Sequence, residues 1–98
     1  MDIENNKIFT LRIKKIYFDR ILINEKKIEY RDFKSFYYKL SSGSIEYIRF
    51  HYQSNIFIIS EILKIEIIDT PEHLKNSNIR FGPAVYAIYL GKIINTNA

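Results

Sequence analysis

The chain of 98 residues contains no cysteine and no tryptophan, and only three glycines and two prolines. The absence of cysteine excludes a disulfide scaffold, a cysteine-ligated zinc site and a cysteine nucleophile. With tyrosine counted as polar, the longest unbroken apolar run is the four residues from Ile56 to Ile59, too short to span a membrane. The acidic first residues lack the apolar segment of a signal peptide. We therefore expect a cytoplasmic protein without membrane partners.

The composition predicts one globular domain. Apolar residues make up 47% of the chain, enough to form a core at this length, and no linker rich in glycine, proline or serine divides it. Isoleucine occurs 20 times and lysine 10 times. Both residues have AT-rich codons, so we interpret this bias as the mark of a bacterial or phage genome of that composition.

Positive charge is concentrated in one part of the chain. The net charge is +4, and residues 12–39 carry nine basic against four acidic side chains, whereas residues 40–98 carry five of each. A surplus of this kind is either an ordinary solvated face or a surface that contacts phosphate groups.

Residue periodicity predicts a mixed α+β fold. Alternating or β-branched stretches predict five strands, at residues 7–14, 26–33, 45–53, 56–68 and 84–94. A helix is expected over residues 15–23, a helical turn over 34–40, and a third helix after a Thr70 cap. With short connections, these elements favour a small mixed β-barrel or curled sheet of about five strands with two or three short helices.

Three local features sharpen this prediction. Asn24 is expected to end the first helix, because asparagine tolerates the left-handed backbone conformation. The strand over residues 56–68 is expected to be buried and bent. Gly91 within the last strand indicates a bulge or a close backbone approach.

The segment from Tyr17 to Arg31 resembles the signature of ASCH domains, which are PUA-like β-barrels that open with a helix and the pattern Gly-x-Lys-x-x-Glu-x-Arg. Lys26, Glu29 and Arg31 occupy the lysine, glutamate and arginine places, and Asn24 stands in the glycine place. Residues 86–94 resemble the closing barrel strand of these proteins. The resemblance implies a single ASCH-like domain over residues 1–98, with its core at about 8–94.

The residues themselves indicate a binding site at the same place. Strand alternation puts Lys27, Glu29 and Arg31 on one face, with Lys26 at the preceding turn. The Glu29 carboxylate then orients Arg31, and the remaining donors of Lys26, Lys27 and Arg31 point to phosphate or a base edge. The alternative is that Glu29 and Arg31 form an ion pair that only supports the fold.

The resemblance also implies candidate functions. ASCH domains are proposed RNA-binding modules, so RNA or a nucleotide is the expected partner, bound by Lys26, Lys27, Glu29, Arg31 and Tyr17 in a cleft beneath the first helix. Some members are enzymes, either amidohydrolases acting on a modified cytidine or ribonucleases. In such an enzyme Lys26 and Glu29 are the expected catalytic residues.

A third hypothesis belongs to a different class of function. A small domain from an AT-rich genome suits a phage or mobile-element protein that binds and inhibits a host protein, such as a nuclease of a defence system. An exposed apolar patch around Phe36, Tyr37 and Tyr38 would favour this hypothesis. No cofactor is expected. The two histidines, His51 and His73, are far apart in the sequence and lack further ligands at metal spacing, so no metal site is predicted.

Overall fold

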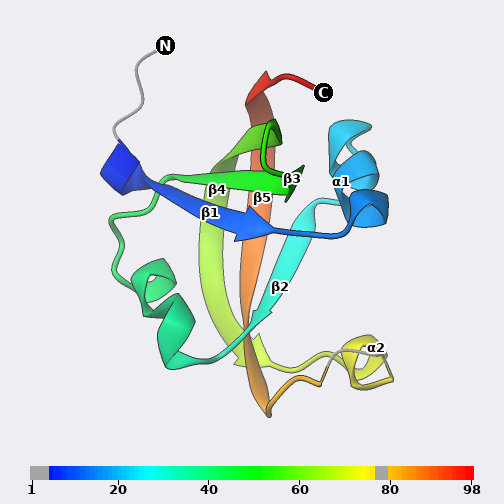
Figure 1. The fold of residues 1–98 in the computed structure, drawn as a ribbon. Coiled ribbons are helices and arrows are strands. Elements are labelled where there is room, and N and C mark those ends of the chain that lie inside the picture. The colour runs from blue at the N-terminus through cyan, green and yellow to red at the C-terminus, as the bar shows by residue number, and fades with distance from the viewer. Residues whose placement is uncertain (1–4, 77–79) are drawn as a thin grey trace.

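The computed structural model describes residues 5–76 and 80–98, without the side chains of Ser35 and Phe36. Five strands form one sheet in the order β1-β3-β4-β5-β2 (Figure 1). The strands are β1 (Ile8–Arg12), β2 (Ile28–Asp32), β3 (Tyr47–Gln53), β4 (Ile56–Asp69) and β5 (Ala84–Thr96). The helices are α1 (Lys15–Leu22) and α2 (Glu72–Lys75), with 3-10 turns η1 (Asn5–Lys7) and η2 (Ser35–Ser41).

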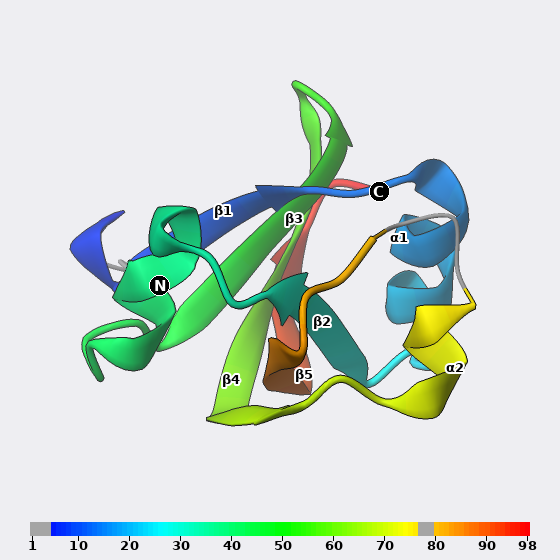
Figure 2. The same ribbon diagram turned by 90° about the horizontal axis from the view of Figure 1, so that it is seen from below.

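The sheet is mixed and curls into a half-barrel. β1 pairs with β3 in parallel, and the other neighbouring pairs are antiparallel. The strand order leaves β1 and β2 as the two edges. Figure 2 shows α1 and α2 at one end of the sheet and η2 at the opposite end. The predicted α+β class is confirmed, and the half-barrel is compatible with a PUA-like fold. No helix of residues 5–76 and 80–98 is long and apolar enough to cross a membrane.

Strand alternation directs one face of the sheet into the core. In β3, Ile48 and Phe50 are fully buried, whereas their neighbours are only partly so. Phe18 of α1 is 1% exposed, and its ring contacts Tyr52 edge-on at a centroid distance of 4.8 Å. The core therefore holds α1 against β3.

The long strand β4 is bent, as predicted, but it is buried only in part. Its register with β5 shifts repeatedly between Ile59 and Lys64, where a Cβ on Gly91 would approach Leu63 Cδ2 at 3.0 Å. The predicted close approach at Gly91 is thus confirmed. Burial over the whole of residues 56–68 was a wrong prediction: beyond Glu61, β4 has lost its partner β3, and Leu63 is 70% exposed.

The predicted Thr70 cap was also wrong. Pro71 occupies the position before α2, and the helix start has no side-chain cap. The Thr70 hydroxyl instead donates to the Gly82 carbonyl oxygen, and its backbone N–H donates to Pro83. Thr70 therefore extends the pairing between the ends of β4 and β5. The sequence also predicts a polar connection after this helix, Asn76-Ser77-Asn78, and most of it lies outside the described residues.

Asn24 ends α1 with φ of 64°, the left-handed conformation expected of it. The backbone N–H groups of Glu25 and Lys26 then both donate to the Arg20 carbonyl oxygen, at 2.8 and 3.0 Å. This turn satisfies the end of the helix and fixes the point at which Lys26 leaves it.

We expect Asn24→Gly to leave the free energy of unfolding within about 0.5 kcal/mol of wild type, because glycine adopts positive φ without strain. Asn24→Ala should lower it by about 1 kcal/mol, because a Cβ disfavours this conformation. Denaturant unfolding measures both values. Equal losses in the two variants would show that the asparagine side chain, and not its backbone conformation, matters.

Candidate functional site

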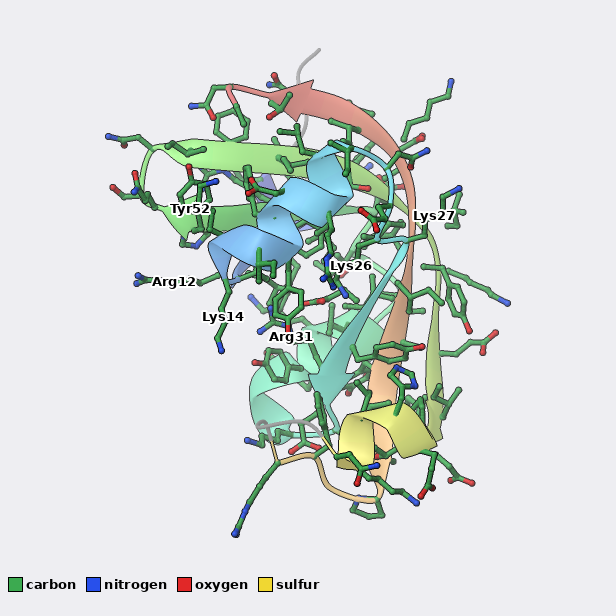
Figure 3. The ribbon with its side chains drawn as sticks, turned by 90° about the vertical axis from the view of Figure 1, so that its right-hand side faces the viewer. Arg12, Lys14, Lys26, Lys27, Arg31 and Tyr52 are labelled. Atoms are coloured by element: carbon green, nitrogen blue, oxygen red, sulfur yellow. The ribbon has the colours of Figure 1, made fainter. Side chains whose placement is uncertain are left out.

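A cavity of about 640 Å³ lies between the end of β1, helix α1 and strand β2. It is therefore at the seam where the half-barrel is open. The described residues that line it are Arg12, Ile13, Lys14, Lys15, Tyr17, Lys26, Glu29, Tyr30, Arg31, Asp32, Lys34, Tyr37, Tyr52, Leu74, Arg80 and Phe81. Figure 3 shows Lys26 and Arg31 close together in this region, with Arg12 and Lys14 to one side.

Glu29 is the centre of a compact ion-pair cluster in the cavity wall. The side chain is on β2 and is 7% exposed. Its Oε1 lies 3.2 Å from Lys26 Nζ, and its Oε2 lies 2.7 Å from an Arg31 terminal nitrogen. Arg31 Nε donates to the same Oε2 at 2.9 Å. One buried carboxylate thus orients two cations, as strand alternation predicted for Glu29 and Arg31.

Lys26 is held by further contacts. Its Nζ donates to the Ile28 carbonyl oxygen at 2.7 Å and lies 5.6 Å from the centroid of the Tyr17 ring. The ammonium group is therefore fixed between a carboxylate, a carbonyl and an aromatic face. The structure brings together four of the five predicted binding residues: Tyr17, Lys26, Glu29 and Arg31.

Arg31 also links the two edges of the sheet. Its Nη2 donates to the backbone oxygen of Arg12, the last residue of β1, at 3.1 Å. The guanidinium carbon lies 6.0 Å from the Tyr37 ring centroid. Arg31 therefore bridges β2 to β1 at the place where these strands do not pair with one another.

The fifth predicted residue, Lys27, lies outside the cavity. The sequence prediction put Lys27 on the face of Glu29 and Arg31, but β2 begins only at Ile28. Lys27 precedes the alternating strand, and its carbonyl accepts a hydrogen bond from Leu90. Figure 3 shows the side chain of Lys27 directed away from Lys26 and Arg31.

Sequence reasoning missed several cavity residues. Arg12 and Lys14 follow one another closely at the end of β1, and Arg80 comes from the segment before β5. The charge surplus of residues 12–39 was a signal for the first two. Nothing in the local sequence marks Arg80, because only the fold brings it to the cavity.

The cavity has a strong excess of positive charge. Seven lysine and arginine residues and two carboxylates are among its described lining residues. Both carboxylates are engaged: Glu29 by Lys26 and Arg31, and Asp32 by the Gly82 N–H at 2.9 Å. Among the described residues, Arg12, Lys14 and Arg80 make no ion pair with a carboxylate. These three cations retain their charge for an anionic ligand.

Two pKa shifts accompany this geometry. A hydrogen bond with Asp19, together with its charge, raises the pKa of Lys15, which therefore stays protonated at neutral pH. Burial, and secondarily Tyr89, raises the pKa of the Tyr30 hydroxyl. Tyr30 thus stays neutral and is a poor general base.

The aromatic residues of the predicted apolar patch do not lie together at the cavity. Tyr37 lines the cavity, whereas Tyr38 is 63% exposed, and the side chain of Phe36 lies outside the described residues. In the described part of the chain, no three histidine, cysteine, aspartate or glutamate side chains gather in a way that could hold a metal ion.

Comparison with known proteins gives no relative from which function can be transferred. No protein-family model, curated protein or solved structure matches this chain significantly.

Proposed function

We propose that the chain is a small ASCH-like domain that binds RNA or a nucleotide in the cavity between β1, α1 and β2. The observation that carries this proposal is the basic lining of the cavity. Seven lysine and arginine side chains line it, against two carboxylates that already interact with other groups of the protein. Phosphate contacts from lysine and arginine supply most of the affinity in nucleic-acid binding.

The aromatic residues of the cavity support the same ligand. Tyr17, Tyr37 and Tyr52 lie among the cations of the lining. Aromatic faces between basic side chains are typical of sites that stack single-stranded bases while holding the phosphates. A ligand with both a flat ring and a phosphate suits this combination better than a simple anion.

The cluster around Glu29 assigns roles to the predicted residues. Arg31 and Lys26, oriented by Glu29, face the phosphate, and Tyr17 lies beside them. Lys27 takes no part in this site, since its side chain points away. The left-handed turn at Asn24 and the half-barrel support the ASCH resemblance, because that signature requires a turn between helix and strand.

The same geometry favours a binder over the hydrolase of the same fold. A catalytic base must lie within reach of the proton it removes, whereas Glu29 is only 7% exposed, forms ion pairs with Lys26 and Arg31, and accepts a hydrogen bond from Arg31 Nε. We therefore expect RNA and acylated nucleosides to remain intact after incubation with the protein. Turnover by the wild type that Lys26→Ala abolishes would instead establish the enzyme.

The experiment that tests binding compares Lys14→Ala with Lys27→Ala. Both are exposed lysines without an ion pair among the described residues, but only Lys14 lines the cavity. Fluorescence titration with single-stranded RNA should show affinity falling steeply with salt. Loss of one phosphate contact in Lys14→Ala should lower affinity about three- to tenfold and reduce the salt slope by about 0.7.

Lys27→Ala is expected to bind as wild type does, because its side chain lies outside the cavity. Equal losses in the two variants would mean that only overall charge matters and that the cavity is not the site. No measurable binding of the wild type at low salt would remove the proposal and favour the host-protein hypothesis.

A further inference from the structure

A second basic surface lies on the outer face of the sheet. The register places Arg12 of β1 beside His51 of β3, and His51 beside Phe57 of β4. Arg49, two residues before His51, shares its face. The alternate residues on these strands are the ones that enter the core. We call Arg12, Arg49, His51 and Phe57 the outer patch.

The contacts within the outer patch combine charge with an aromatic face. The guanidinium carbon of Arg49 lies 4.8 Å from the centroid of the Phe57 ring. Neither Arg49 nor Arg12 makes an ion pair with any carboxylate in residues 5–76 and 80–98. The patch thus presents two cations without counter-charges beside a ring, the pairing that binds single-stranded nucleic acid in other proteins.

Burial and the two arginines of the outer patch both act on the protonation of His51. Burial, followed by the charges of Arg49 and Arg12, lowers the pKa of His51, and a hydrogen bond involving Gln53 opposes this only in part. Phe57 of β4 lies opposite His51 and carries no charge. The nearest carboxylate along β4 is that of Glu61, which lies opposite Tyr47. His51 is therefore neutral at pH 7, and the positive potential comes from the arginines.

The outer patch is continuous with the cavity through one residue. Arg12 lines the cavity and is also the cross-strand neighbour of His51. It is the last residue of β1, the edge strand, so a chain leaving the cavity reaches the outer face around this edge. Arg49 does not line the cavity, so a ligand confined to the cavity lacks contact with it.

From this continuity we infer that the ligand is a single-stranded nucleic-acid chain of several nucleotides. One nucleotide occupies the cavity, and the strand continues past Arg12 onto Arg49, His51 and Phe57. This inference rests on the proposed function of the cavity and deepens it, because it selects a polynucleotide over a free nucleotide.

The test measures affinity against ligand length. Uridine monophosphate and single-stranded oligouridines of about four to eight nucleotides are titrated against wild type, Arg49→Ala and Lys27→Ala. Wild type should bind the oligomers at least tenfold more tightly than the mononucleotide. Arg49→Ala should remove most of this gain and leave the affinity for the mononucleotide unchanged. Lys27→Ala should alter neither.

Three results would count against the inference, and they separate it from the proposal on which it rests. If wild type binds mononucleotide and oligomers equally, the outer patch is not a binding surface, while the cavity still is. If Arg49→Ala weakens binding of the mononucleotide and of the oligomers equally, the outer patch is again not the surface that binds the longer strand. If no probe binds at low salt, the cavity proposal itself fails, and this inference fails with it.

A second measurement needs no variant and so is independent of folding defects. Phosphate groups near His51 favour its charged form, so its pKa, followed by NMR, should rise when an oligomer is added. The mononucleotide, confined to the cavity, should raise it much less. A pKa of His51 that the oligomer leaves unchanged would overturn the inference.

Discussion

Replacing Phe18 with alanine is expected to lower the free energy of unfolding by about 4 kcal/mol. The side chain is 1% exposed and belongs to the main hydrophobic cluster, and removal of a buried phenylalanine side chain costs about 3–5 kcal/mol through lost burial and the cavity left behind. The edge-on contact with Tyr52 at 4.8 Å is lost as well. Denaturant unfolding followed by circular dichroism measures the change.

Ile16→Ala is the matched control, because Ile16 is on the same helix but is 55% exposed. We expect it to change stability by less than about 0.5 kcal/mol. Since Phe18 holds α1 against β3, Phe18→Ala should also weaken RNA binding by loosening Tyr17 from the cavity. A Phe18→Ala protein as stable as Ile16→Ala would show that α1 is not packed on the sheet in this way.

Replacing Glu29 with glutamine is expected to lower the free energy of unfolding by about 3 kcal/mol. Glutamine keeps the shape of the side chain but removes the negative charge that Lys26 and Arg31 share at 3.2 and 2.7 Å. Removing one member of a buried ion pair costs about 3–5 kcal/mol, because the other charges lose their partner in a poorly solvated place. Thermal and denaturant unfolding of the purified variant report the loss.

Asp19→Asn provides the comparison for Glu29→Gln. Asp19 pairs with Lys15 at 2.8 Å, but both side chains are about half exposed or more, and exposed pairs contribute about 0–1 kcal/mol. The two substitutions are chemically alike and differ in burial. If they cost the same, the cluster around Glu29 is solvated and does not hold the cavity wall together.

Part of this fold could be predicted from local sequence alone. The alternation of residue types predicted β3 correctly, because Ile48 and Phe50 lie in the core while the residues between them face outward. The prediction that Asn24 ends α1 was also correct for a local reason, because the ability to adopt positive φ depends on the sterics of that one residue. Such features require no knowledge of distant segments.

The errors arose where distant segments decide the outcome. Thr70 has the sequence context of a helix cap, yet Gly82 offers its hydroxyl a carbonyl across the sheet end. The isoleucine-rich β4 resembles a buried strand throughout, but β3 is too short to cover its second half.

In the candidate site, too, some features depend on local sequence and others on distant segments. The alternation of Glu29 and Arg31 was predictable because two residues of one strand share a face. Lys27 is not among the residues that line the cavity, and the strand starts at Ile28, two residues later than the predicted range of 26–33. Arg80 and Tyr52 reach the cavity only through the curl of the sheet, which the periodicity of single segments does not encode.

The bridge from Arg31 to the backbone of Arg12 has a consequence for how this chain can evolve. A barrel closed by paired strands has many bonds along its seam, whereas here β1 and β2 do not pair and the Arg31 side chain spans the gap between them. Lysine cannot replace it, since one ammonium group lacks the planar fork that reaches a carboxylate and a carbonyl in different directions. Because the acceptor at position 12 is a backbone oxygen, the side chain there is free to vary without loss of the bridge, whereas homologous chains that keep this seam should retain arginine at position 31.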